Sequence, residues 1–210
     1  EMDMAAGDWE MHCPHCQVPV AALPTDEDKP LHATSIYAIT KKDQEEMCLI
    51  MGRAYGIPTV ALRYFNTYGS RQALSNPYTG VAAIFSGRLL NGHAPIIFED
   101  GRQSRDLVHV SDIVQANVLA MKREEMNDGV YNVGTGRSLT ILDVADALIR
   151  YMDSDRVPEI TQEFRAGDIR HCFADIGRIV AEGYAPKVTF EEGTAELMAW
   201  VRSQTAVDAF

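Results

Sequence analysis

The chain has 210 residues, of which 46% are hydrophobic, enough to form one or two compact cores. Its 19 basic and 30 acidic residues give a formal net charge of -11, which argues against broad binding to nucleic acid or to an anionic membrane. No apolar run approaches the roughly 20 residues that a membrane span needs, and residues 1–9 lack the pattern of a signal peptide. We therefore expect a cytoplasmic protein.

Residues 1–30 are rich in turn-forming and acidic residues, which predicts an irregular insertion. The segment contains Cys13 and Cys16, and their spacing is that of half a zinc site. His12 and His15 could add ligands, but neighbouring residues reach a single metal poorly. A zinc half-site and a pair of solvent-facing thiols are about equally supported.

A helical pattern begins at Ser35 and runs to about Tyr55, where Gly56 and Pro58 end it. Residues 59–65 are β-branched, apolar and aromatic, which predicts a buried strand. A helix followed by a short turn and a buried strand is typical of α/β folds.

The rest of the chain continues to alternate helices with short strands. The patterns predict helices over 81–90, 112–122, 138–151 (with Ser138 as N-cap) and 192–202, and strands over 95–98, 107–110, 130–133 and 159–164. This alternation predicts a parallel sheet with helices on both faces, together with a second, smaller lobe.

Tyr37 and Lys41 are four residues apart, so their side chains share one face of the predicted helix. A nearby ammonium favours the phenolate form of a tyrosine, and a tyrosine so placed can exchange a proton with a sugar hydroxyl. An isolated pair at this spacing is far more often a packed tyrosine covered by the lysine stem. The context of the pair must therefore decide between the two interpretations.

Seven stretches supply that context: SIYAITK at 35–41, QEE at 44–46, YGIP at 55–58, LRYFNTYG at 62–69, RDLVHVSD at 105–112, NVGTG at 132–136 and RAGD at 165–168. In this order they resemble the NAD-dependent nucleotide-sugar epimerases and dehydratases, which are extended short-chain dehydrogenases. The resemblance covers about residues 30–200. It implies an α/β fold in which the latter part of a Rossmann-like parallel sheet is interleaved with a small α/β substrate-binding lobe.

The resemblance also implies three domain segments. Residues 1–30 would be the cysteine-bearing insertion, and residues 31–70 the Rossmann-like helix and strand. Residues 71–210 would form the substrate-binding lobe, interleaved with the last Rossmann elements at about 105–136.

Three residues match positions that the family uses for catalysis and for NAD. Tyr37 matches the catalytic tyrosine, and Lys41 matches the lysine that binds the nicotinamide ribose and assists the tyrosine. Phe65 would lie near the nicotinamide.

Five further residues match substrate ligands of the family. Asn66 would lie near the sugar diphosphate, Phe98 would wall off the base, Arg105 and Arg165 would bind the diphosphate, and Asp168 would accept from a ribose hydroxyl. Each has a simpler interpretation: a turn for Asn66 and Asp168, core packing for Phe98, and a surface ion pair for each arginine.

Two other groups look catalytic but are interpreted as structural. His109 lies in a predicted apolar strand beside Ser111 and Asp112, where a histidine is more often a hydrogen-bonded structural residue than part of a catalytic triple. Residues 134–136 lack the trailing lysine and the full glycine spacing of a phosphate loop, and they are interpreted as a strand-to-helix turn.

The family begins with a strand and a Gly-x-x-Gly-x-x-Gly loop that holds the dinucleotide pyrophosphate, and it places a catalytic Ser or Thr before the tyrosine. Nothing before Tyr37 matches either feature. We therefore expect the chain to be a portion of a longer enzyme, inactive by itself.

The expected activity of the full-length protein is NAD-dependent 4-epimerisation of a nucleotide sugar, either dTDP-L-rhamnose or a UDP-hexose. The alternatives are a dTDP-glucose 4,6-dehydratase-like lyase and a non-catalytic nucleotide-sugar-binding remnant. The expected partners are the nucleotide sugar and a second subunit in a homodimer, with neither nucleic acid nor membrane.

Overall fold

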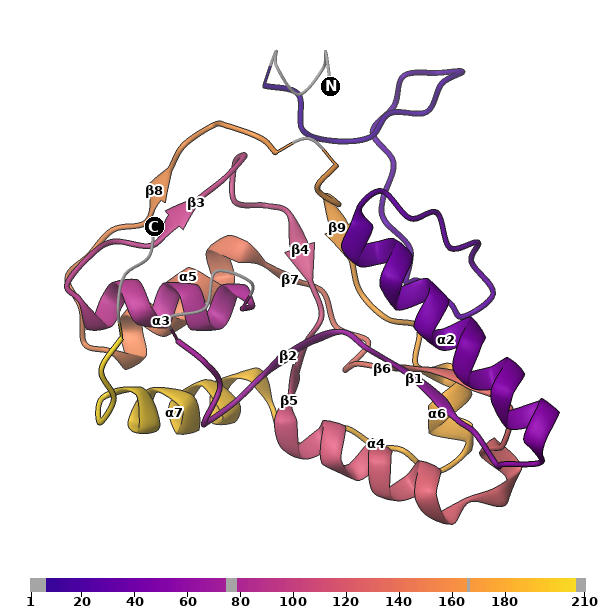
Figure 1. Ribbon diagram of the computed structural model, residues 1–210. Coiled ribbons are helices and arrows are strands. Elements are labelled where there is room, and N and C mark those ends of the chain that lie inside the picture. The colour runs from indigo at the N-terminus through magenta and orange to yellow at the C-terminus, as the bar shows by residue number, and fades with distance from the viewer. Residues whose placement is uncertain (1–6, 75–78, 166, 207–210) are drawn as a thin grey trace.

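The computed structural model describes residues 7–74, 79–165 and 167–206 (Figure 1). The first helix of the described residues, α2 (Ile36–Tyr55), begins where the Ser35 side chain accepts a hydrogen bond from the Ala38 amide. It ends at Gly56, whose φ of 64° lies in the left-handed region that favours glycine. The predicted helix is thus confirmed at both ends.

Two pairs of parallel strands follow one another through the centre of the fold. Strand β1 (Ala61–Tyr64) pairs with β6 (Val130–Val133), and β2 (Asn66–Tyr68) pairs with β5 (Leu107–His109). Neither pair is consecutive in the chain, so the connections are crossovers that carry helices. The predicted parallel α/β architecture is confirmed, although the segment predicted as one strand over 59–65 ends at Tyr64.

A second group of strands, called the smaller lobe together with the helices that enclose it, consists of two-residue strands. In one set β3 (Ile96–Ile97) pairs with β8 (Glu159–Ile160); in the other, β4 (Ser104–Arg105) lies between β7 (Leu139–Thr140) and β9 (His171–Cys172). Periodicity cannot signal strands this short, so β4, β7 and β9 were not predicted, and the strand predicted over 159–164 is shorter than expected.

Three helices enclose the core of the smaller lobe: α3 (Val81–Leu90), α5 (Ile141–Tyr151) and α7 (Phe190–Val201). They lie together on one side of the strands (Figure 1). Their buried side chains, among them Phe85, Leu148 and Leu197, form one apolar cluster with Tyr68 and Leu107 of the central strands. Packing therefore joins the smaller lobe to β2 and β5.

A second apolar cluster includes side chains of β5 and β6. It packs residues such as Val108 and Val133 against α4 (Val110–Lys122), the 3-10 turn η1 (Glu124–Met126) and α6 (Gly177–Ala181).

Three predicted helix starts were wrong. Helix α4 begins at Val110 rather than at residue 112. Helix α5 begins at Ile141 rather than near Ser138, because Thr140 is its N-cap and forms a capping box with Asp143. Helix α7 likewise begins before residue 192, because Thr189 and Glu192 form a second capping box.

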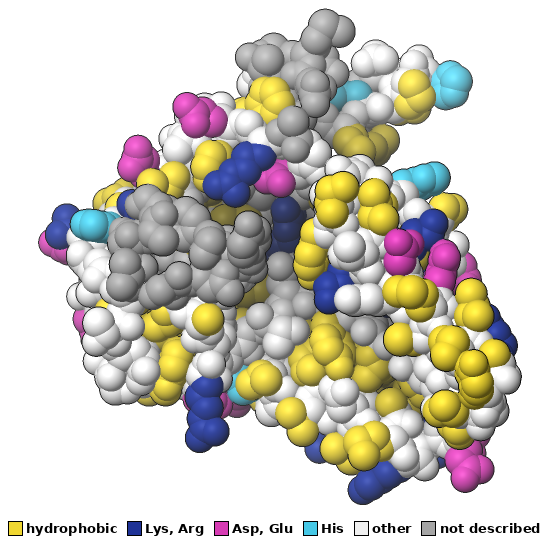
Figure 2. Space-filling model, viewed as in Figure 1, with side chains coloured by type: hydrophobic (Ala, Val, Ile, Leu, Met, Phe, Trp, Pro, Cys, Tyr) yellow, Lys and Arg dark blue, Asp and Glu magenta, His cyan; other side chains and the backbone are white. Residues whose placement is uncertain are grey.

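Helix α2 buries little of its surface. Only Leu49 and Gly52 are buried, whereas Ile36, Met47, Ile50 and other apolar side chains are exposed. Hydrophobic side chains spread along α2 and over the surface between α2 and α4 (Figure 2). Within the described residues, no helix is both long enough and apolar enough to cross a membrane.

Candidate functional site

The tyrosine–lysine pair lies at the start of α2. Lys41 Nζ is 5.5 Å from the centroid of the Tyr37 ring, within the range of a cation–π contact. The same ammonium donates to Gln44 Oε1 at 3.3 Å. Tyr37 is 71% exposed, and its hydroxyl makes no hydrogen bond within the described part of the chain. The helix therefore presents a tyrosine and an ammonium side by side to an open surface.

Phe65 and Asn66 mark the place where the chain leaves one strand pair and joins the next. The Phe65 amide donates to Val133 O at 3.0 Å, and the Asn66 amide donates to Asp106 O at 3.0 Å. Both side chains are partly buried. Asn66 is thereby placed next to the strand that carries Arg105.

The Asp106 carboxylate holds together the backbone segments that surround Asn66 and Arg105. It is fully buried and accepts hydrogen bonds from the Thr135 amide (2.8 Å), the Thr135 hydroxyl (2.7 Å), the Gly136 amide (2.9 Å) and the Ala174 amide (3.2 Å). A Cβ on Gly134 would come within 2.6 Å of Asp106 Oδ2, so a glycine is required there. The turn at 134–136 wraps a protein carboxylate. It joins β6 to the short strand β7 rather than leading directly into a helix as predicted.

Arg105, which precedes this anchor, is partly buried. Its Nη1 donates to Ser104 O at 2.8 Å and to Arg170 O at 3.0 Å. Burial lowers the pKa of the Arg105 guanidinium. Electrostatic interactions with Cys172, Asp168 and Glu99 act in the opposite direction and offset part of this lowering. Arg105 forms no ion pair within the described residues, so the surface ion pair considered from the sequence is absent there. A partly buried guanidinium without a carboxylate partner is suited to an anionic ligand.

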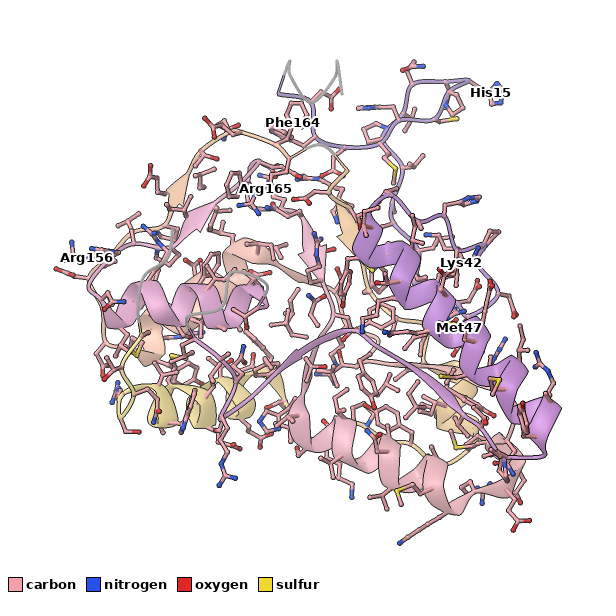
Figure 3. The ribbon with its side chains drawn as sticks, viewed as in Figure 1. His15, Lys42, Met47, Arg156, Phe164 and Arg165 are labelled. Atoms are coloured by element: carbon pink, nitrogen blue, oxygen red, sulfur yellow. The ribbon has the colours of Figure 1, made fainter. Side chains whose placement is uncertain are left out.

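Arg165 and Phe98 contact each other directly. The Arg165 guanidinium carbon is 4.0 Å from the centroid of the Phe98 ring. Phe98 follows β3, and Arg165 belongs to the exposed segment that joins β8 to β9 (Figure 3). Asp168 is exposed in the same segment, and its amide donates to Arg165 O at 3.2 Å. An exposed guanidinium on an aromatic face can contact both a base and a phosphate.

The structure therefore groups the predicted residues into two sets. Residues 98, 105, 165 and 168 gather around the strands of the smaller lobe, and Asn66 adjoins them through Asp106. Tyr37 and Lys41 lie on α2, and no hydrogen bond or ring contact between described residues links them to that group.

Arg170 was missed in the sequence analysis. Its side chain, 7% exposed, donates from Nη1 to Glu99 and Asp100, both at 2.7 Å, and from Nη2 to Glu10 at 2.6 Å. Burial lowers the pKa of Arg170, but the hydrogen bonds to Asp100, Glu10 and Glu99 outweigh it and raise the pKa overall. The only sequence signal for a buried cationic partner was the acidic pair Glu99 and Asp100, which follows the predicted apolar strand at 95–98.

This cluster ties the N-terminal segment to the smaller lobe. The Glu10 carboxylate contacts Arg170 through Oε1 and lies 3.2 Å from His171 Nε2 through Oε2. On the other side of the ring, His171 Nδ1 is 2.9 Å from Ser104 Oγ. Further along the segment, the Thr25 amide donates to Phe173 O at 2.8 Å. Residues 7–30, the described part of the region predicted as an irregular insertion, contain no regular helix and pack against β9 (Figure 1).

The two cysteines of this segment lie in a tight turn. An antiparallel bridge joins His12 and Pro19 at its base, and both thiols are free. Within the described residues, no group of three or more His, Cys, Asp or Glu side chains could hold a metal ion. The zinc half-site at Cys13 and Cys16 thus stays a prediction.

Metal analysis of the purified chain is expected to give well under one zinc per molecule. A structural zinc ion takes four ligands in a tetrahedron, and Cys13 and Cys16 supply two. The measurement is elemental analysis after dialysis, with the Cys13→Ser variant as the reference for adventitious metal. One equivalent of zinc that this substitution removes would contradict the expectation.

His109 and Asp112 are both held by hydrogen bonds. The buried His109 ring contacts Ser111 Oγ through Nδ1 at 2.8 Å and meets the Tyr68 ring edge-on at 5.5 Å. Asp112 accepts from the amides of Lys187 and Val188 at 3.0 and 3.2 Å. The expected hydrogen bond of His109 is confirmed, and its interpretation as a structural residue stays a prediction.

Residues 15–134 match the sequence model of the NAD dependent epimerase/dehydratase family. A putative UDP-glucose 4-epimerase of Methanocaldococcus jannaschii is 33% identical over 181 residues, which are 86% of this chain and 58% of the relative. The dTDP-L-rhamnose 4-epimerase of Burkholderia thailandensis is 33% identical over 81% of this chain and 47% of its own length. The chain thus spans about half the length of the curated relatives it matches.

Solved structures agree with these matches. The UDP-glucose 4-epimerase of Thermotoga maritima with UDP-glucose superposes with a TM-score of 0.80 at 36% identity, over 87% of this chain and 58% of that one. A Thermus thermophilus UDP-glucose 4-epimerase in complex with NAD gives a TM-score of 0.76 at 30% identity, over 93% and 60% of the two chains.

Proposed function

Because the chain belongs to the NAD-dependent epimerase/dehydratase family, we propose that it contributes the tyrosine–lysine pair and the substrate lobe of a nucleotide-sugar 4-epimerase. The observation that carries the proposal is the exposed Tyr37 ring with the Lys41 ammonium 5.5 Å from its centroid. Relatives named for UDP-glucose and dTDP-L-rhamnose 4-epimerisation support the choice of reaction. The proposed substrate is a UDP-hexose or dTDP-L-rhamnose, turned over by the full-length protein.

In this proposal Tyr37 exchanges a proton with the C4 hydroxyl of the sugar. Lys41 lies close enough to stabilise a phenolate and would also contact the nicotinamide ribose, with Phe65 beside the nicotinamide. NAD, when bound, accepts and returns a hydride. These residues fit the nicotinamide end of the cofactor, but no Gly-x-x-Gly-x-x-Gly loop occurs in the 210 residues.

Epimerisation is preferred to dehydration because the relatives and solved structures reported above are named for 4-epimerisation. Product analysis separates the two reactions. An epimerase gives an isomer of unchanged mass, whereas a dehydratase gives a product lighter by one water. We further propose that the protein is cytoplasmic and forms a homodimer.

The 210 residues alone are expected to bind NAD too weakly to measure and to leave UDP-glucose, UDP-galactose and dTDP-L-rhamnose unchanged. Most of the hold on a dinucleotide comes from backbone amides at a glycine-rich helix N-terminus. Calorimetric titration with NAD, and chromatography of the sugars, would measure both. The control is the same chain joined to the glycine-rich half of an epimerase. Micromolar NAD binding without that half would contradict the expectation, and an inactive joined chain would count against the proposed function.

The substrate lobe is proposed to bind the nucleoside diphosphate. Arg105 offers a partly buried guanidinium without an ion-pair partner among the described residues, and Arg165 offers an exposed one held against Phe98. Phe98 would face the base, while Asn66 and Asp168 would contact the diphosphate and the ribose. Together they provide positive charge, an aromatic face and hydrogen-bonding groups on an acidic protein.

Replacing Arg105 or Arg165 by alanine is expected to weaken binding of the nucleotide sugar by about 1.5–3 kcal/mol, or roughly 10- to 150-fold, because each removes a charged hydrogen bond to the diphosphate. Titration with UDP-glucose and with dTDP-L-rhamnose measures the loss. Arg156→Ala is the matched control, since Arg156 is an exposed arginine elsewhere on the lobe (Figure 3). Its Nε lies 3.9 Å from Oδ1 of the neighbouring Asp155, which is a weak, exposed ion pair. Equal effects at Arg156 and Arg165 would disprove the assignment of Arg165.

A further inference from the structure

Two lysines lie next to each other on α2, and each has a glutamate four residues further along the helix. At this spacing two side chains are neighbours on the helix surface. Lys42 forms an ion pair with Glu46, with Nζ 3.7 Å from Oε1. Lys41 and Glu45 have the same spacing but form no ion pair in the part of the chain that the structure describes. The helix by itself therefore does not explain the difference.

The difference comes from Arg63 on β1. Its Nε and Nη2 donate to the two carboxylate oxygens of Glu45 at 2.8 and 2.7 Å, and its Nη1 donates to Glu27 O at 3.0 Å. The Arg63 and Glu45 side chains are only 21% and 15% exposed. A guanidinium that contacts both oxygens of a carboxylate binds it more strongly than a single ammonium does. Both oxygens of Glu45 are thus occupied by a residue of the strand.

This arrangement leaves the Lys41 ammonium with uncharged neighbours. It lies 5.5 Å from the centroid of the Tyr37 ring and donates to Gln44 Oε1 at 3.3 Å. A carboxylate in contact with the ammonium would compete for it, because charged partners form stronger hydrogen bonds than neutral ones. Lys41 therefore keeps its charge and its donors for Tyr37 and for a ligand.

We propose that Arg63 is a positioning residue for the tyrosine–lysine pair: by holding Glu45 against β1, it keeps the Lys41 ammonium beside Tyr37. This inference rests on the function proposed above for Tyr37 and Lys41. Without Arg63, the partly buried Glu45 carboxylate would lose the partner of both its oxygens. Lys41, one turn back along α2, would then pair with it as Lys42 pairs with Glu46.

Lysine acylation tests the proposal on the 210-residue chain without any ligand. A neighbouring carboxylate favours the charged ammonium, and an N-hydroxysuccinimide ester acylates only the neutral amine. Brief treatment with N-hydroxysuccinimidyl acetate, followed by peptide mapping, gives the rates at Lys41 and Lys42. Each lysine is compared only with itself in another variant, so the unequal exposure of the two does not affect the result.

Two isosteric substitutions on α2 form the first comparison. Glu46→Gln removes the Lys42 pair and should raise the acylation rate of Lys42 by about 1.4- to 2.3-fold, the effect of an exposed pair at this spacing. Glu45→Gln should leave the rate at Lys41 unchanged, because Arg63 already holds that carboxylate. A faster Lys41 in the Glu45→Gln chain would overturn the proposal, since Glu45 would then pair with Lys41 in the unmodified protein.

Arg63→Met should give the opposite result. Acylation of Lys41 is expected to slow by about fivefold, an effect at the low end for a partly buried group that loses its partner. Adding Glu45→Gln should restore the rate, because no carboxylate is left to pair with Lys41. An unchanged Lys41 in an Arg63→Met chain that is folded by circular dichroism would contradict the proposal. If this variant does not fold, the comparison of Glu45→Gln with Glu46→Gln decides alone.

Turnover of the full-length enzyme separates this inference from the proposed function. Per folded molecule, Arg63→Met should lower turnover by a similar factor, while the KM for the nucleotide sugar changes little. A merely structural role would lower the folded fraction and leave the turnover of each folded molecule unchanged. The expected lysine rates together with unaffected turnover would refute the catalytic role of Lys41, but they would support the hold of Arg63 on Glu45.

Discussion

Replacing Tyr37 by phenylalanine is expected to lower the turnover of the full-length enzyme by about 10²–10⁴-fold, because the loss of a general acid/base costs that much. The substitution removes only the hydroxyl and leaves the ring next to the Lys41 ammonium. Binding of the nucleotide sugar should change little, since most of its proposed ligands lie in the smaller lobe. Steady-state assays and titrations with the same substrate measure the two effects separately.

The chain supplies a matched control for this substitution. Tyr55 is also on α2 and is 70% exposed, close to the 71% of Tyr37, but it lies at the opposite end of the helix. Tyr55→Phe should therefore retain nearly full activity. A Tyr37→Phe enzyme within about tenfold of the unmodified protein would remove Tyr37 from the catalytic role, since general acid/base groups contribute more than that.

Replacing Arg170 by methionine is expected to destabilise the folded chain by about 3–5 kcal/mol, because breaking a buried ion pair leaves an uncompensated charge. The Glu99 side chain, 4% exposed, would lose a hydrogen bond of 2.7 Å. Glu10 and Asp100 would lose the same partner, and with it the anchor between the N-terminal segment and the smaller lobe. Urea unfolding followed by circular dichroism measures the change.

Arg202→Met is the control for the Arg170 prediction. Arg202 lies 2.6 Å from Asp153, but both side chains are largely exposed, so the cost should be about 0–1 kcal/mol. In the Arg170→Met background, Glu99→Gln should recover part of the lost stability because it removes the unpaired charge. Equal costs at Arg170 and Arg202 would show that the buried cluster is not the source of the effect.

The sequence alone determined the parts of the protein that depend on neighbouring residues. A helical pattern was predicted from Ser35 to about Tyr55, ended by Gly56 and Pro58, and the helix Ile36–Tyr55 agrees with it because capping and left-handed glycine are local interactions. The i,i+4 spacing of Tyr37 and Lys41 predicted their contact for the same reason. The family followed from motifs in chain order, and residues 15–134 confirm it.

Tertiary structure decided what depends on residues far apart in the chain. The Arg170 cluster joins side chains from positions 10, 99 and 100, up to 160 residues away, and no local pattern can pair an arginine with carboxylates at that separation. The two-residue strands β4, β7 and β9 exist because three distant segments pair with one another, which sequence periodicity does not record. The same holds for Arg105. Its sequence suggests a phosphate ligand or a surface ion pair, and only the folded chain shows a partly buried guanidinium whose hydrogen bonds go to backbone carbonyls, leaving its charge without a carboxylate partner among the described residues.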